Sequence, residues 1–254
     1  MSMGWILAAA LFLPLFPLSL AFNRLVASLP PGLAQALAVL ALPQCGLGLL
    51  RLAPPVSALP VAVRHWGMAW AVLSAFLYAF RTLSAREIGV WTRLLLSSGL
   101  ALAWLGWWNG TPLPVLEVLV FGWTWPAAIM LWLVGALVRR LGGAYAGLQG
   151  GIVRVMPRMA ASLTLAVLAL AATPVFPAFF ATWRTFSPLL INWVPFLLPL
   201  LFFWGWASAR LFQDLLFGRY RGETVPDLSR GSALLMNLLL LASLILNFYP
   251  NGVG

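Results

Sequence analysis

The chain is organised as long apolar stretches separated by short polar segments. The stretches are continuous and do not alternate as the strands of a membrane barrel do, and a spanning helix needs about 20 mainly apolar residues. The pattern therefore predicts an all-α integral membrane protein with about eight transmembrane helices. The predicted spans cover residues 5–22, 33–50, 61–80, 89–108, 114–138, 159–184, 189–217 and 232–248.

The sixth predicted span is interrupted by the sequence from Thr173 to Pro177. Its two prolines remove two backbone donors and break the hydrogen-bond ladder, which predicts a discontinuous helix. Transporters use such breaks to bring free carbonyls to ions, but a proline kink that only shapes packing explains the pattern equally well. Pro14 and Pro17 lie inside the first span, which we expect to be one helix. Pro195 and Pro199 predict tilt or a kink in the seventh.

The composition is that of a membrane protein, and it affects how the net positive charge is interpreted. Of the 254 residues, 63% are hydrophobic and only 8% are charged, whereas a soluble domain has about 25% charged residues. The net charge of +10 comes from 15 arginines, with no lysine in the chain. These arginines are thinly spread between the apolar stretches, as in the loops of membrane proteins. The sequence therefore indicates the lipid bilayer, and not nucleic acid, as a partner.

Arginines are distributed unequally between the two sets of loops. The odd-numbered loops carry Arg24, Arg81, Arg86, Arg139, Arg140, Arg154, Arg158, Arg219, Arg221 and Arg230, and the even-numbered loops carry Arg51, Arg64 and Arg184. The positive-inside rule then places the odd loops in the cytoplasm. We expect a multi-pass protein of a bacterial-type inner (cytoplasmic) membrane with both termini on the outer face. No basic residue precedes the first apolar stretch, which indicates a retained span and not a cleaved signal.

Few ionisable residues fall inside the predicted spans, and such residues are functional candidates by default. Glu117 is near the start of the fifth span, where it could relay protons or be an interfacial carboxylate bound to water or an arginine. Arg210 and Asp214 are four residues apart, which predicts a structural ion pair on one helix face. Arg93 is explained by its guanidinium reaching the headgroups.

Residues for catalysis or metal binding are scarce. His65 is the single histidine and Cys45 the single cysteine, so neither a metal cluster nor an internal disulfide is expected. The glycine-rich segment 142–151 lacks the lysine of a phosphate loop and predicts a flexible turn. No set of nucleophile, base and metal ligands is present. We therefore expect no cofactor, no metal and no enzymatic activity of the chain's own, which makes a membrane-embedded enzyme the weakest hypothesis.

Four segments occur in an order found in one known family. They are residues 78–95 (Tyr-Ala-Phe-Arg to Arg-Leu-Leu), 142–157 (Gly-Gly to Met-Pro), 170–180 (the interrupted span) and 217–250 (Phe-Gly, Val-Pro-Asp-Leu-Ser-Arg and Tyr-Pro). Together they resemble the C-terminal half of the antiporter-like subunits of respiratory complex I (NADH:quinone oxidoreductase) and of multisubunit cation/proton antiporters. The resemblance covers about residues 65–253, and the apolar pattern before it predicts two N-terminal transmembrane helices and a Pro-rich link in residues 1–60. The resemblance implies a six-helix domain in residues 61–254 that resembles half of a proton-translocating subunit.

The departures from the family concern its proton path. The resemblance places Pro126 where the family has its central lysine, and Gly122 where a histidine is common. The lysine that follows the broken helix falls near Thr182, and Arg184 is the nearest cation. Proline cannot titrate, and arginine does not deprotonate at accessible pH. The resemblance therefore implies a truncated relative that has lost the proton-path lysines.

Two functions remain open from the sequence. The first is an accessory or structural membrane subunit, hetero-oligomeric with a larger antiporter-like or other membrane subunit. Its complex would be a complex I-like oxidoreductase, an antiporter, a membrane hydrogenase or an inorganic-carbon uptake system. The alternative is a reduced ion or proton transporter. Its candidate path comprises Glu117, Thr173, Pro174, Pro177, Thr182 and Arg184.

Overall fold

The computed structural model describes residues 2–147, 150–187, 190–218, 220 and 225–248. Within these residues the chain is helical, with no strand and one isolated β-bridge between Glu87 and Tyr145. The predicted all-α class is therefore confirmed. In chain order the helices are α1 (Ser2–Phe12), α2 (Ser19–Ser28), α3 (Leu33–Leu50), the short 3-10 helix η1 (Val56–Ala58), α4 (Val61–Ser84), α5 (Ile88–Trp108), α6 (Leu113–Leu141), α7 (Ile152–Val155), α8 (Pro157–Leu170), α9 (Pro177–Phe186), α10 (Leu190–Leu216) and α11 (Arg230–Phe248). Arg219, Arg221 and the Tyr249-Pro250 end of the fourth family-like segment lie outside the described residues.

Four helical stretches of the described chain are long and apolar enough to cross a bilayer. They are Leu33–Leu50, Ile88–Trp108, Leu113–Leu141 and Val194–Leu216. Shorter apolar helices cover Met3–Phe12, Pro157–Leu170 and Arg230–Leu244. Apolar spans of this kind are those of a membrane protein, and the count of about eight crossings stays a prediction.

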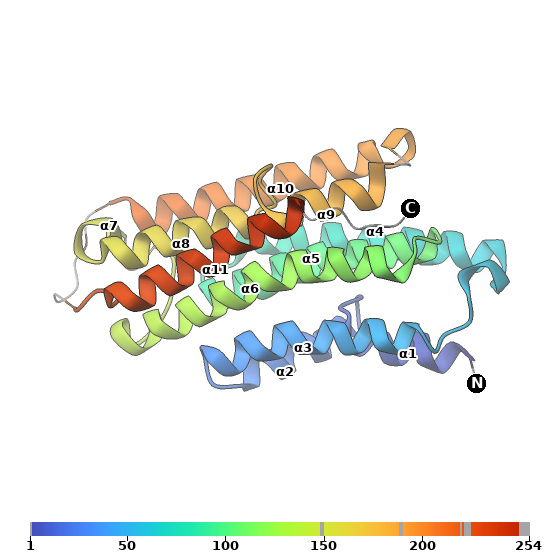
Figure 1. Cartoon of the computed structure of the whole chain (residues 1–254), viewed down its shortest axis with the longest axis horizontal. Helices are drawn as coiled ribbons and strands as arrows, with labels where there is room; N and C mark the ends of the chain where they lie inside the picture. Colours follow the sequence, from blue (N-terminus) through green and yellow to red (C-terminus); the bar gives the residue numbers. More distant parts are fainter. Residues whose placement is uncertain (1, 148–149, 188–189, 219, 221–224, 249–254) are drawn as a thin grey trace.

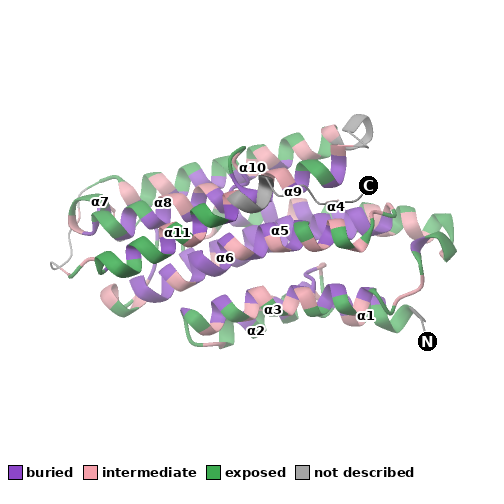
Figure 2. Ribbon diagram, in the orientation of Figure 1, coloured by how far each residue is buried: buried purple, intermediate pink, exposed green. Residues whose placement is uncertain are grey.

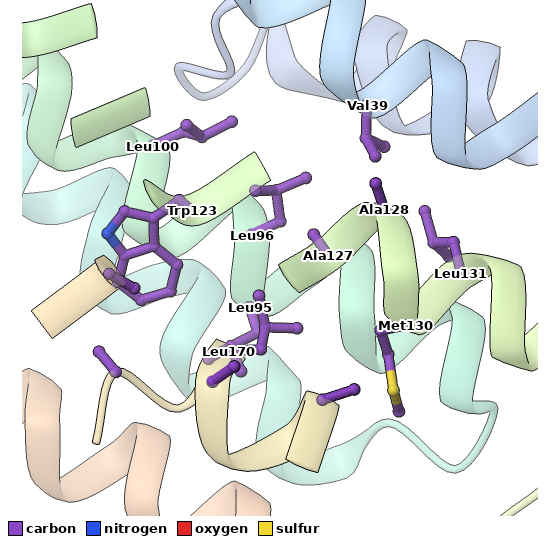
Figure 3. Close-up of a cluster of buried hydrophobic side chains, with 14 of the residues drawn as sticks. Val39, Leu95, Leu96, Leu100, Trp123, Ala127, Ala128, Met130, Leu131 and Leu170 are labelled. Carbon is purple, nitrogen blue, oxygen red and sulfur yellow. The ribbon is translucent and has the colours of Figure 1, made fainter. Parts of the chain in front are cut away.

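Helices α5 and α6 form the centre of the bundle. In the spanning stretch of α5, 94% of the residues are buried, against 28% in the stretch of α10 (Figure 2). The layer of α1, α2 and α3 lies along one side of α6, and α8, α9, α10 and α11 lie on the other (Figure 1). In Figure 3, Val39 of α3 points toward Ala128 of α6, and Trp123 lies among leucines of the centre. Apolar residues around the whole circumference of α5 therefore become core, while α10 keeps a face for lipid or another protein.

The N-terminal layer approaches α6 at backbone distance. A Cβ atom added to Gly135 would lie 2.3 Å from the Cα atom of Gly32, at the start of α3. Gly32 itself has φ of 114°, a conformation that favours glycine. Glycine at both positions thus allows the α2–α3 turn to lie directly against α6.

The first predicted span differs from the expectation of a single helix. α1 ends at Phe12 and α2 begins at Ser19, so residues 13–18, the first break, separate two short helices. Pro14 and Pro17 lack the N–H groups that a continuous helix would need. The prediction of one continuous helix over residues 5–22 is therefore wrong, because the prolines end the helix.

The sixth span is discontinuous as predicted. α8 ends at Leu170 and α9 begins at Pro177, so residues 171–176 form the second break. The start of α8 is fixed by the C-terminal loop, since both carboxylate oxygens of Asp227 accept hydrogen bonds from its backbone. The Arg158 and Met159 N–H groups donate to Asp227 at 2.9 and 3.0 Å. Asp227 therefore satisfies two free N–H groups in the first turn of α8, as an N-cap side chain does.

Candidate functional site: two broken helices around a tryptophan core

The first break is bound by side chains of α4 and α5. The indole N–H of Trp104 donates to the Leu13 carbonyl at 3.0 Å, and the indole of Trp70 donates to the Phe16 carbonyl. The Phe16 N–H donates to Ser74 Oγ at 3.3 Å. Unpaired backbone groups are expensive in hydrocarbon, so these bonds stabilise a break at membrane depth. They also occupy carbonyls of the kind that transporters use to coordinate ions.

The second break closes mostly on its own backbone. The hydroxyl of Thr173 donates to the Leu168 carbonyl at 3.1 Å, and the N–H groups of Val175 and Phe176 donate to the Thr173 carbonyl at 2.7 and 3.0 Å. Ala172 has φ of 51°, a strained conformation for a residue with a side chain. Pro174 and Val175 are exposed on the surface of the chain. This break therefore reaches an outer face of the bundle instead of being enclosed by it.

Helices α6 and α9 meet next to the second break. A Cβ atom on Gly122 would lie 3.2 Å from the Pro177 carbonyl oxygen, so the absent side chain allows this approach. One turn of α9 further, Thr182 is buried and donates its hydroxyl to the Ala178 carbonyl at 2.7 Å. Thr182 also accepts a hydrogen bond from the Trp123 indole at 3.3 Å. The Thr182 hydroxyl thus acts as donor and as acceptor, and it links α6 to α9.

Two indole rings fill the centre between these helices. The rings of Trp123 and Trp204 are edge-to-face, with centroids 4.7 Å apart, and both side chains are fully buried. The Trp204 indole donates to Ser98 Oγ at 2.9 Å, and Ser98 donates to the Ala75 carbonyl at 2.7 Å. These hydrogen bonds and the ring contact connect α9, α6, α10, α5 and α4 in sequence. We name the four side chains Thr182, Trp123, Trp204 and Ser98 the tryptophan core.

None of the tryptophan core side chains is an acid or base near neutral pH. Indole donates only, and the hydroxyls of threonine and serine are not ionised in this range. A cavity of about 80 Å³ adjoins the core between α9 and α10, and its lining is apolar apart from Thr182 and the Trp183 and Trp204 indoles. Among the described residues, Arg93 is the one charged side chain that is buried. The centre of the bundle therefore provides tight packing and little for a titrating proton path.

Glu117 lies away from this centre. Its carboxylate forms an ion pair with Arg51, at the end of α3, and both side chains are substantially accessible, at 35% and 61%. This is the only ion pair within 4.0 Å among the described residues. The arrangement matches the interpretation of Glu117 as an interfacial carboxylate bound to an arginine. The structure does not bring Glu117 together with the second break in a polar contact.

The other candidate residues occupy varied positions. Pro126 is buried inside α6, and Arg184 is exposed on α9. Arg210 and Asp214 both line a cavity of about 360 Å³, but the structure does not join them in an ion pair. The Arg210 guanidinium instead donates to the Leu83 carbonyl at 2.9 Å. The Arg210 guanidinium therefore binds a free carbonyl at the end of α4 instead of the nearby Asp214 carboxylate.

Sequence reasoning missed the residues that bind the first break. Trp70, Trp104 and Ser74 were not among its candidates. Trp125 of α6 likewise bonds to another helix, since its indole donates to the Leu239 carbonyl at 3.0 Å. A tryptophan inside a span, in a chain with proline-broken helices, is the signal that could have identified the others.

No family model and no curated protein sequence matches the chain. Solved structures do match it. A chain of respiratory complex I from Thermus thermophilus with bound NADH shares 24% identity and superposes with a TM-score of 0.82 over 98% of this chain. A chain of the Mrp complex from Dietzia sp. DQ12-45-1b shares 12% identity with a TM-score of 0.76 over 96%. The chain has the fold of these complex I and Mrp complex chains.

The likeness covers nearly the whole described chain, including the N-terminal layer. It extends over 54% and 55% of the two matched chains, so this chain spans about half the length of the solved chains it resembles. A second chain of Thermus thermophilus complex I, with bound aureothin, matches at 14% identity and a TM-score of 0.72. At these identities the likeness establishes the fold, while activity and partners are matters for proposal.

Proposed function

We propose that this chain is an accessory or structural membrane subunit of a proton-coupled multisubunit complex, and that it does not itself conduct ions. The observation that carries the proposal is the tryptophan core. An antiporter-like fold surrounds a centre made of indole rings and hydroxyls whose donors are all used within the protein. A proton path needs titratable groups, and none of the four side chains of the tryptophan core is an acid or base near neutral pH.

The first break supports the same proposal. Its Leu13 and Phe16 carbonyls accept hydrogen bonds from indoles, so an ion that used them would have to displace these donors. Pro126 cannot replace the lysine that the family places on the central helix. We therefore interpret the first break as a packing element, because its Leu13 and Phe16 carbonyls are already bound by indoles of the described chain.

The exposure of the second break supports the proposal of a partner subunit. Val175 is 59% exposed, and non-helical backbone at membrane depth is tolerated only where protein or a water-filled cavity covers it. The weakly buried α10 lies next to it and carries the exposed side chains of Leu198 and Phe202. We propose that this face of α9 and α10 packs against another membrane subunit, which would be an antiporter-like or other membrane protein of the same complex. The membrane is proposed to be a bacterial-type inner membrane, with the arginine-rich loops in the cytoplasm.

Co-isolation tests the partner. The tagged chain, extracted from its native membrane in mild detergent, is expected to bring down a stoichiometric membrane protein that mass spectrometry identifies. Val175→Trp places a bulky ring on the proposed interface and is expected to reduce the yield at least several-fold. Leu37→Trp on α3, which is 56% exposed on the opposite layer, is the matched control. The partner proposal fails if no stoichiometric protein is recovered, or if the two variants behave alike.

The alternative is a reduced ion transporter that uses Glu117 and the second break, and the discontinuity between α8 and α9 favours it. Proton flux into liposomes that contain the purified chain separates the two functions. We expect flux equal to that of protein-free liposomes, with Glu117→Gln unchanged, because Glu117 is paired with Arg51 at the surface. Flux that Glu117→Gln abolishes and the exposed control Arg154→Gln leaves intact would establish the transporter instead.

A further inference from the structure

A cavity of about 180 Å³ between α2, α4 and α5 is lined by three arginines and no acidic residue. The arginines are Arg24, Arg81 and Arg93, one from each helix. Tyr78 and Asn23 form part of the same wall. Three guanidinium groups around one open cavity create a strong preference for an anion.

Of the three arginines, Arg93 has the greatest need of a counter-ion. Its side chain is only 8% exposed inside an apolar helix, and the described residues provide it with no hydrogen bond and no ion pair. Glu87 acts on it from beyond ion-pair distance and does not line the cavity. Because a buried charge without a partner is costly, an external anion would stabilise this arrangement.

The walls of the cavity are apolar where they continue along the bundle. Leu20 and Leu94 line it together with the arginines, and Leu20 is 38% exposed. Arg81 lies in the last turn of α4 and Arg93 in the second turn of α5, so the cavity is near the ends of these helices. A charged recess that opens onto an apolar helix surface has the layout of a lipid headgroup site.

We propose that this cavity binds the headgroup of an anionic phospholipid, for which phosphatidylglycerol is the probe. The phosphate lies among Arg24, Arg81 and Arg93. The acyl chains follow the apolar surface of α2. The site does not depend on whether the chain conducts ions.

Native mass spectrometry of the delipidated full chain tests the site. Phosphatidylglycerol is expected to bind in preference to phosphatidylcholine with the same acyl chains, because only the former carries net negative charge. Arg93→Gln is expected to weaken this binding about tenfold, the loss expected for a charge-assisted hydrogen bond. Arg81→Gln is the second variant, because Arg81 is exposed and its replacement does not disturb the core. Arg154→Gln on α7, an exposed arginine outside the cavity, is expected to bind as the wild type does.

Three results would overturn the proposal. Equal binding of the two lipids would remove the anionic preference, and unchanged phosphatidylglycerol binding by both Arg93→Gln and Arg81→Gln would place the lipid elsewhere. Full competition by inorganic phosphate at buffer concentration would assign the cavity to a free anion instead of a lipid.

Discussion

Replacing Trp123 with alanine is expected to lower the free energy of unfolding by about 3–5 kcal/mol. The side chain is fully buried, packs edge-to-face on Trp204 and donates to Thr182. Its ring also fills the space beside Gly99, where an added Cβ would lie 2.2 Å from a ring carbon. Truncation therefore leaves a large cavity between α5, α6 and α10, and the surrounding helices cannot close it fully.

Unfolding of the detergent-solubilised chain, followed by circular dichroism, measures this loss. Trp66→Ala is the matched control, since Trp66 is 77% exposed and its loss is expected to change stability by no more than about 0.5 kcal/mol. Trp123→Phe keeps most of the ring volume, gives up the hydrogen bond to Thr182 and is expected to fall between the two. Equal stability of the Trp123→Ala and Trp66→Ala proteins would refute the structural role of the tryptophan core.

Replacing Gly135 with alanine is expected to destabilise the packing of the N-terminal layer on α6. The new Cβ would lie 2.3 Å from the Cα atom and 2.5 Å from the nitrogen of Gly32, and backbone atoms cannot rotate out of the way as a side chain can. The layer of α1, α2 and α3 must therefore move away from α6. We expect a loss of about 1–3 kcal/mol, the usual cost of overpacking, or more if the layer detaches.

Thermal unfolding and limited proteolysis of the α2–α3 turn report the two consequences of Gly135→Ala separately. Gly48→Ala is the control, because Gly48 is also a helix-interior glycine and nothing lies within 4 Å of its added Cβ. The control is expected to be neutral or to gain about 0.5–1 kcal/mol from higher helix propensity. If Gly135→Ala is as stable and as protease-resistant as Gly48→Ala, the close contact between the layer and α6 is not maintained in solution.

Hydrophobic patterning predicted most of the helices, because the position of an apolar span depends mainly on the bilayer. Spans of about 20 apolar residues and their proline breaks can be identified without knowledge of their neighbours. The same reasoning failed at Pro14 and Pro17, which were expected to be tolerated inside one helix. What decides between a kinked and a divided helix is whether other helices can satisfy the freed backbone groups, and here Trp104, Trp70 and Ser74 do so. Those contacts are tertiary and have no local signature.

The candidate site could be predicted only in part for a similar reason. The interfacial alternative for Glu117 could be stated from its place near a span end, but its partner Arg51 is 66 positions away. Arg210 and Asp214 satisfy the spacing rule for an ion pair, yet a carbonyl of α4 is the group that binds Arg210. The tryptophan core was largely hidden, because indoles in spans are usually explained by the interface. Spacing along one helix predicts which residues share a face, and does not predict what faces them.

The hydrogen bonds of the first break can form only after later parts of the chain have been synthesised. The Leu13 carbonyl and the Trp104 indole that satisfies it are 91 positions apart in the chain. The Leu13 and Phe16 carbonyls are bound by indoles of α5 and α4, which are made later than the break itself. We therefore expect the Leu13 carbonyl to lack its indole donor while roughly 90 further residues emerge from the ribosome. Ribosome-stalled chains that end before Trp104 should consequently be extracted from the membrane more easily than those that end after it.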